Sequence, residues 1–121
     1  MTIGDVLNRV DELEPNQYST EQKMRWLTVL DGKIFEEIIK THMSPIRTEF
    51  NEYSDTGEEL LVPFPYADDL YSWYLQAKIA AENSESGKYE QARIIYNDAL
   101  KQFGDWYNRN HMPIGGVRFW F

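Results

Sequence analysis

Apolar side chains in the last third of this chain recur at the spacing of one helix face, and this feature constrains the fold more than any other. The intervals between them are three, four, three, four and three residues, through Tyr89, Ala92, Tyr96, Ala99, Phe103 and Trp106. A seam of this kind packs along another helix at a shallow angle, as in helical bundles. We therefore expect a long helix here, which Asn110 and Pro113 end.

Two earlier segments begin with residues that cap helices. Thr2 can accept a hydrogen bond from the first turn of a short helix, where Asp5 also interacts favourably with the helix dipole. Ser19 and Gln22 form a capping-box pattern, and the apolar stripe that follows them reaches His42. These signals predict a short first helix and a long second one.

The segment after the second helix has a different pattern. Arg47 to Tyr53 alternates loosely, Asp55-Thr56-Gly57 indicates a turn, and Leu60-Leu61-Val62 is a short extended run before Pro63. We expect a two-stranded β-hairpin or an extended arm at about residues 44–64. Because an isolated hairpin is marginal in water, it should lean on the helices or on a neighbouring subunit.

A third helix is expected to begin at Pro65 or Tyr66. The predicted fold class is therefore mainly all-α. We expect a four-helix bundle-like domain over residues 1–113, with the hairpin or arm inserted between its second and third helices, and an extended C-terminal arm over residues 114–121. The length of 121 residues fits one such domain.

The C-terminal residues form the most unusual segment of the chain. Gly115 and Gly116 provide a hinge. Of the five residues after them, Val117, Phe119, Trp120 and Phe121 are large and apolar, and Arg118 is charged. Burial of these side chains would remove roughly several hundred Å² from water, which is worth several kcal/mol. Two interpretations stay open: the tail folds back over its own helices, or it inserts into another protein as an aromatic anchor.

Charge and cysteine content exclude several classes of function. The formal net charge of −8 disfavours tight binding to a nucleic-acid backbone, which needs Lys and Arg. The same charge can keep the protein soluble, or it can repel a DNA duplex that slides past. Because the chain has no Cys, disulfides, thiolate catalysis and iron–sulfur clusters are excluded. Without a long apolar stretch or a leader-like N-terminus, a soluble, cytoplasmic protein is expected.

The sequence contains no pattern typical of a catalytic or metal site. Its two histidines, His42 and His111, are expected at helix ends, where an imidazole can meet the last carbonyl groups. Adjacent carboxylates point to different sides of a helix and are interpreted as solvated faces: Asp11-Glu12, Glu36-Glu37, Glu58-Glu59 and Asp68-Asp69. The Trp and Tyr residues are interpreted mostly as core, because base-stacking platforms sit in basic grooves. We expect no enzyme activity, no cofactor and no bound metal.

Several motifs together resemble small structural proteins of phages and prophages of Gram-positive bacteria. They are Pro15-Asn16; Trp26-Leu27, Leu30-Asp31-Gly32, Ile34 and Ile38; Leu61-Val62-Pro63, Pro65-Tyr66, Leu70-Tyr71 and Tyr74-Leu75; and Tyr96-Asn97, Phe103 and the run from Trp106 to Pro113. The resemblance spans nearly the whole chain and carries no catalytic signature. Within this group the chain most resembles the head-tail connector, also called the adaptor or head completion protein.

This resemblance implies a helical bundle with a protruding loop or hairpin and a C-terminal arm. Such subunits form a homo-oligomeric ring, expected to be dodecameric, under the portal protein of the filled head. A tail-side stopper or terminator protein binds the opposite side, and DNA passes through the lumen without specific binding. The implied location is the virion, at the portal-tail junction, after assembly in the bacterial host cytoplasm and with no membrane role.

The resemblance also implies roles for particular residues. Gly115 to Phe121 would be the portal-docking arm, and the segment from Arg47 to Val62 would reach a neighbouring subunit or ring. The residues expected in those contacts are Phe50, Tyr53, Leu61 and Val62. The acidic charge leaves a second class open, an inhibitor or DNA mimic that binds a basic groove of a host protein. That alternative has no obvious use for the aromatic tail.

Overall fold

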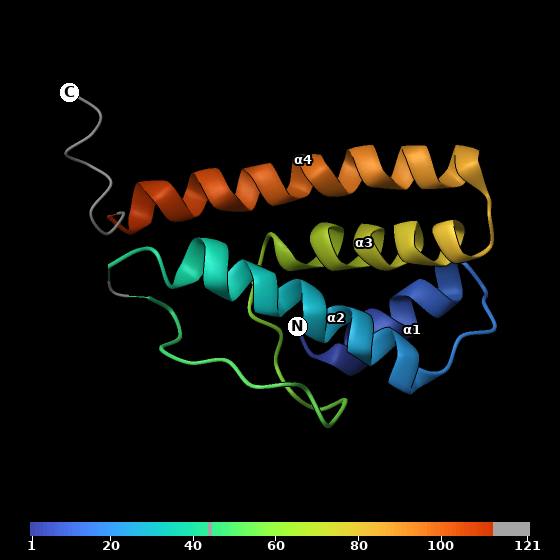
Figure 1. Ribbon diagram of the computed structural model, residues 1–121, viewed down its shortest axis with the longest axis horizontal. Helices are drawn as coiled ribbons and strands as arrows, with labels where there is room; N and C mark the ends of the chain where they lie inside the picture. Colours follow the sequence, from blue (N-terminus) through green and yellow to red (C-terminus); the bar gives the residue numbers. More distant parts are fainter. Residues whose placement is uncertain (44, 113–121) are drawn as a thin grey trace.

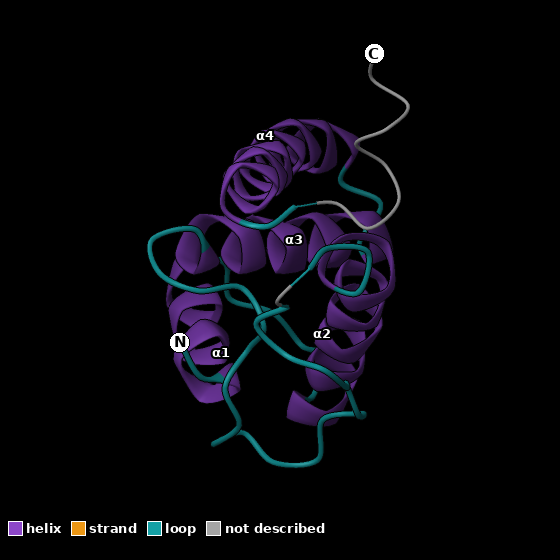
Figure 2. Cartoon of the chain, turned by 90° about the vertical axis from the view of Figure 1, so that its left-hand side faces the viewer, coloured by secondary structure: helices purple, strands orange, loops and turns teal. Residues whose placement is uncertain are grey.

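Four α-helices and one π-helical turn make up the computed structural model, which describes residues 1–43 and 45–112 (Figure 1). The elements are α1 (Ile3–Leu13), α2 (Thr20–Ile34), the π-helix η1 (Phe35–Ile39), α3 (Ala67–Glu82) and α4 (Ser86–Asn110). α3 and α4 lie antiparallel along their lengths, while α1 and α2 pack on the other side of α3 (Figures 1 and 2). The mainly all-α prediction is confirmed.

Both predicted cap residues, Thr2 and Ser19, accept a hydrogen bond at the start of a helix, but among the described contacts the full capping box is found at Thr2 and not at Ser19, where it was predicted. The Thr2 hydroxyl accepts from the Asp5 backbone N–H at 3.2 Å, and the Asp5 carboxylate accepts from the Thr2 N–H at 3.0 Å, which completes a capping box. These two bonds lower the pKa of Asp5. The Ser19 hydroxyl accepts from the Gln22 N–H at 3.1 Å, so α2 begins where its cap predicts.

The second helix ends earlier than predicted. Its regular hydrogen bonding stops at Ile34, and the π-helical turn η1 follows, in which the Lys40 N–H donates to the Phe35 carbonyl oxygen at 2.8 Å. A π turn holds one residue more than an α turn, so the residues after it rotate relative to the predicted stripe. His42 lies beyond the end of η1, and it is buried.

The predicted β-hairpin is wrong. Across the described parts of the chain no β-strand forms, and an isolated bridge joins Thr2 to Glu59. Carbonyl groups of the loop 45–66 instead accept hydrogen bonds from the start of α1. The Ile3 N–H donates to the Glu58 carbonyl oxygen at 3.0 Å, and the Gly4 N–H donates to the Thr56 carbonyl oxygen at 2.8 Å. The first N–H groups of a helix lack partners within the helix, so the loop satisfies them where a second strand was expected.

A buried carboxylate, Asp31 of α2, holds the middle of this loop. Its side chain is fully buried and accepts from the Tyr53 hydroxyl, from the Tyr71 hydroxyl at 2.6 Å and from the Leu61 N–H at 3.1 Å. The Tyr71 hydroxyl in turn accepts from the Val62 N–H at 2.9 Å. Asp31 thus joins the loop to both α2 and α3.

Apolar packing surrounds this polar group. Tyr53, Leu60, Leu61 and Val62 of the loop are buried in the same core as the apolar faces of the helices. Complete burial of a side chain of this size contributes about 1.5–3 kcal/mol. The loop is therefore part of the core, although it has no regular secondary structure.

Replacement of Asp31 should destabilise the fold strongly. Asp31→Ala leaves two buried hydroxyls and a buried N–H without their acceptor, and each unsatisfied group costs about 1–3 kcal/mol. We expect a loss of about 3 kcal/mol or more in the free energy of unfolding, measured by urea denaturation. The exposed Glu37→Ala should change it by less than about 0.5 kcal/mol. Equal effects of the two variants would contradict the proposed role of Asp31.

The pH dependence of stability should also report on Asp31. Burial raises its pKa above the ordinary value of 3.8, so the folded state binds this proton more tightly than the unfolded state. The contribution of the protonated Asp31 carboxyl group to the free energy of unfolding is full below pH 3.8, and it is lost as the pH rises through the folded-state pKa of Asp31. The stability of the wild type minus that of Asp31→Asn, measured by denaturation at each pH, should therefore fall as the pH rises. A difference that grows with pH would show that the hydrogen bonds to the carboxylate outweigh its burial.

Candidate functional site

The predicted portal-docking arm, Gly115 to Phe121, lies outside the described residues, and its role stays a prediction. The predicted contact residues of the loop lie within the domain. Tyr53, Leu61 and Val62 are buried among the chain's own helices. Phe50 is half-buried, with its ring 6.3 Å from that of Phe35 and 5.2 Å from that of Tyr53. The inter-subunit role of these side chains also stays a prediction.

The end of α4 is joined to the residues that follow η1. The Met43 N–H donates to the Met112 carbonyl oxygen at 2.7 Å, and the Ile46 N–H donates to the Tyr107 hydroxyl at 3.3 Å. The buried Tyr107 ring contacts two imidazoles, with His42 edge-on at 5.0 Å and His111 stacked at 4.0 Å between ring centroids. These contacts fix the point at which the chain continues beyond residue 112.

His42 is the central polar group of this joint. Its Nδ1 lies 2.5 Å from the Ile38 carbonyl oxygen, and its Nε2 lies 2.5 Å from the side-chain amide oxygen of Asn108. A carbonyl oxygen only accepts, so Nδ1 donates to Ile38, and a neutral ring then bonds Asn108 when the amide NH₂ group of Asn108 faces Nε2. The imidazole therefore bridges η1 and α4. Among residues 1–43 and 45–112, no group of three or more His, Cys, Asp or Glu side chains is placed to hold a metal.

Large apolar side chains are exposed around this joint. Met43, Ile46 and Met112 are 50%, 43% and 56% exposed. Phe64, which is 90% exposed, lies two residues before Tyr66, whose ring centroid is 5.5 Å from that of Trp106 of α4. We call Met43, Ile46, Phe64 and Met112 the apolar end. Exposed methionine and aromatic side chains are typical of protein contact surfaces.

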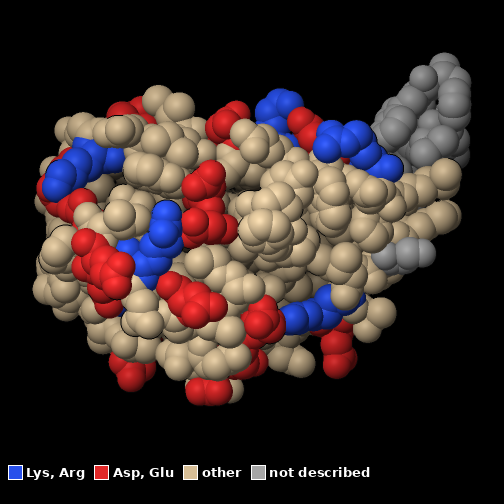
Figure 3. Space-filling model, turned by 180° about the vertical axis from the view of Figure 1, so that it is seen from behind, with Lys and Arg blue, Asp and Glu red and all other residues tan. Residues whose placement is uncertain are grey.

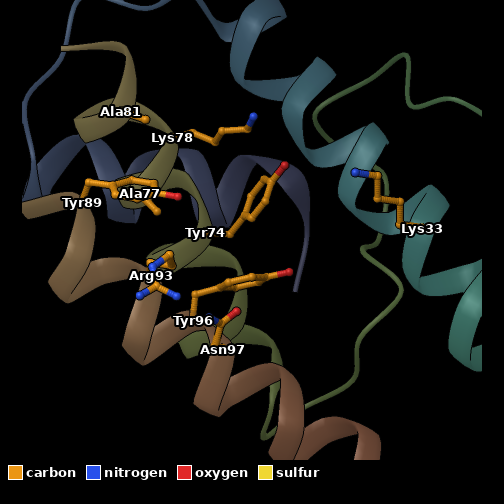
Figure 4. Close-up of a pocket in the computed structure, with 9 residues that line it drawn as sticks. All are labelled: Lys33, Tyr74, Ala77, Lys78, Ala81, Tyr89, Arg93, Tyr96 and Asn97. Atoms are coloured by element: carbon orange, nitrogen blue, oxygen red, sulfur yellow. The ribbon is translucent and has the colours of Figure 1, made fainter. Parts of the chain in front are cut away.

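A second surface feature is a groove between α2, α3 and α4, with a volume of about 420 Å³ (Figure 4). The rings of Tyr74 and Tyr96, whose centroids are 5.3 Å apart, project into it from α3 and α4. Lys33, Lys78 and Arg93 line it, each from a different helix. We call this hollow the tyrosine groove. It can accept an anionic group beside aromatic walls.

Comparison with known protein families, curated proteins and solved structures finds no match to this chain. Among the helices that the structure describes, none is long and apolar enough to cross a membrane. Interpretation of the two surface features therefore depends on their own geometry and chemistry.

The role of Asp31 was not recognised from the sequence. Asp31 falls in line with the apolar stripe of Leu27 and Ile34, and a charged residue on such a stripe is a signal for a buried carboxylate. Tyr107 is fully buried, as expected for the aromatic residues interpreted as core, and the His42 ring packs against it. The tyrosine groove had no such signal, since its cations come from three separate helices.

Substitution of His42 should loosen the joint. His42→Ala removes a buried ring and its contacts with Ile38 and Asn108, and we expect a loss of about 2 kcal/mol in the free energy of unfolding. His111→Ala removes a less buried imidazole and should cost about 1 kcal/mol or less. Urea denaturation of both variants tests this order. If His111→Ala is as damaging as His42→Ala, the buried bonds of His42 do not hold the joint.

Proposed function

We propose that this chain is a structural subunit of a phage virion, of the head-tail connector class. It forms a ring under the portal protein and joins the DNA-filled head to the tail, where a stopper or terminator protein binds its other side. The observation that carries the proposal is the apolar end, because it includes Met112 and the aromatic C-terminal segment follows Met112 in the sequence.

The apolar end and the C-terminal segment have matching chemistry. The domain exposes two methionines, an isoleucine and a phenylalanine, and the segment beyond residue 112 adds Phe119, Trp120 and Phe121. Residues of these types dominate the binding energy of protein interfaces when they are desolvated at the centre of a contact. A partner that covered both would bury apolar side chains of each. The portal protein is the partner that this proposal assigns to it.

The joint around His42 supports an anchoring role. Its hydrogen bonds hold Met112, Tyr107 and Asn108 to the segment that follows η1. A segment that begins from a fixed point has less freedom to lose on binding than one that begins from a loose end. The strong negative charge also fits a subunit beside a DNA channel, because carboxylates repel the phosphate backbone.

Deletion of Val117 to Phe121 tests this function in the particle. The shortened domain should keep a melting temperature within a few degrees of the full chain, while head-tail joining in phage particles should fail because the arm cannot dock. The matched control is Ile94→Ser, which removes an exposed apolar side chain from the middle of α4. That variant should leave particle assembly unchanged.

Three results would overturn the proposal. Particles that assemble normally without the segment would remove its docking role. Electron microscopy that finds no density for this chain at the portal-tail junction would remove the location. Tight, salt-sensitive binding to a nucleic-acid enzyme, with no incorporation into particles, would instead support the acidic inhibitor or DNA mimic.

A further inference from the structure

The tyrosine groove gathers positive charge on an acidic molecule. Lys33 of α2 is exposed and Lys78 of α3 is half-buried, and neither has an ion-pair partner within residues 1–43 and 45–112. Arg93 of α4 pairs with Glu90 at 2.9 Å. Figure 4 shows the Lys33 and Lys78 side chains converging on the space in front of the tyrosine rings. The groove therefore offers two free ammonium groups to an anion.

The tyrosine hydroxyls add hydrogen-bond donors to this charge. Within the described residues, neither the Tyr74 nor the Tyr96 hydroxyl has a hydrogen-bond partner, and both rings are half-buried. Burial raises the pKa of Tyr74, and it raises the pKa of Tyr96 to about 12, so both hydroxyls keep their protons at neutral pH. Ammonium groups beside neutral O–H donors are suited to carboxylate oxygens, which only accept.

We propose that the tyrosine groove binds carboxylate side chains from the loop 45–66 of a second copy of this chain. The inference rests on the proposed function, because it assigns the contact that would link neighbouring subunits of the ring. The loop carries five carboxylates and one arginine. Glu49, Glu52 and Asp55 are exposed and have no ion pair among the described residues.

The positions of the two surfaces favour a head-to-tail contact. In Figure 1 the middle of the loop lies on the opposite side of the molecule from α4, although its two ends reach α4 through Ile46 and Tyr66. The groove lies against α4. Viewed from behind, Asp and Glu side chains follow the lower edge of the molecule, where Figure 1 places this loop and the start of α2 (Figure 3). A groove and a loop on different sides cannot pair twice in one symmetric dimer. Repetition of one such contact gives a closed ring or an open filament.

The groove is better suited to a protein carboxylate than to a nucleic acid. A chain with a net charge of −8 repels a phosphate backbone, and the groove supplies only a local patch of opposite sign. The loop is also well placed to present carboxylates, because Tyr53 and Leu61 fix it to Asp31. A fixed loop loses little conformational freedom on docking.

Charge reversal on each surface gives the decisive experiment. Self-association of the full chain is measured by sedimentation at low ionic strength, at protein concentrations up to ~1 mM. Lys33→Glu with Lys78→Glu makes the groove acidic, and Glu49→Lys with Glu52→Lys makes the loop basic. Each double variant alone should associate at least ~10-fold more weakly than the wild type. An equimolar mixture of the two should associate again, because acidic grooves then meet basic loops and basic grooves meet acidic loops.

The control reverses two cations outside the groove, Lys40→Glu with Lys101→Glu, and should leave association within about twofold of the wild type. Circular dichroism checks that every variant is folded. A wild type that stays monomeric at ~1 mM, association insensitive to groove reversal, or a mixture that fails to recover would each overturn this contact. None of these results would contradict a location of the chain at the portal-tail junction. The proposed function is tested separately, by whether the chain is present in particles.

Discussion

The structure depends on the buried Asp31 carboxylate. A carboxylate in an apolar core is costly unless its oxygen atoms are hydrogen-bonded, and here two hydroxyls and one backbone N–H satisfy them. Those donors come from the loop 45–66 and from α3, so the same contacts that stabilise the carboxylate determine the path of the loop. The loop then runs along the first turn of α1, where its Thr56 and Glu58 carbonyl oxygens accept hydrogen bonds from the N–H groups of that turn. One charged side chain thereby fixes the relative positions of α1, α2, α3 and an irregular segment.

The loop is held at both ends as well as at its middle. Near its start the Ile46 N–H donates to Tyr107 of α4, and near its end the Val62 N–H donates to Tyr71 of α3. A segment without regular secondary structure usually has many backbone groups in water and opens easily. Here the bonds to Asp31, Tyr71 and Tyr107 oppose such opening. The exposed carboxylates between those points are therefore held in defined positions on the surface. Met43 and Ile46 of the apolar end are likewise held beside α4 by their hydrogen bonds.

Local signals predicted the helices, and long-range contacts account for what was missed. The caps at Thr2 and Ser19 and the seam of α4 involve residues within a few positions of one another, so the sequence alone contains them. The hairpin prediction failed because the partners of the loop, at Ile3, Gly4 and Asp31, lie far away in the sequence. The residue His42, which follows the π turn, likewise has distant partners, because it packs against Tyr107 and Asn108 of α4. The tyrosine groove required the relative placement of three helices, which no spacing pattern encodes.

Separation of charge connects the two surface features. An acidic protein of this size can stay soluble and avoid DNA with its carboxylates spread over the whole surface, but it then repels its own copies. A repeated contact therefore needs a site of opposite sign within that surface. The ammonium groups of Lys33 and Lys78, which have no ion-pair partner among the described residues, provide one such site beside tyrosine hydroxyls that stay neutral. The four side chains of the apolar end are uncharged, so binding there would gain its free energy from desolvation of apolar surface. This end therefore suits a different partner. The two surfaces can thus be occupied at once without competing for the same chemistry.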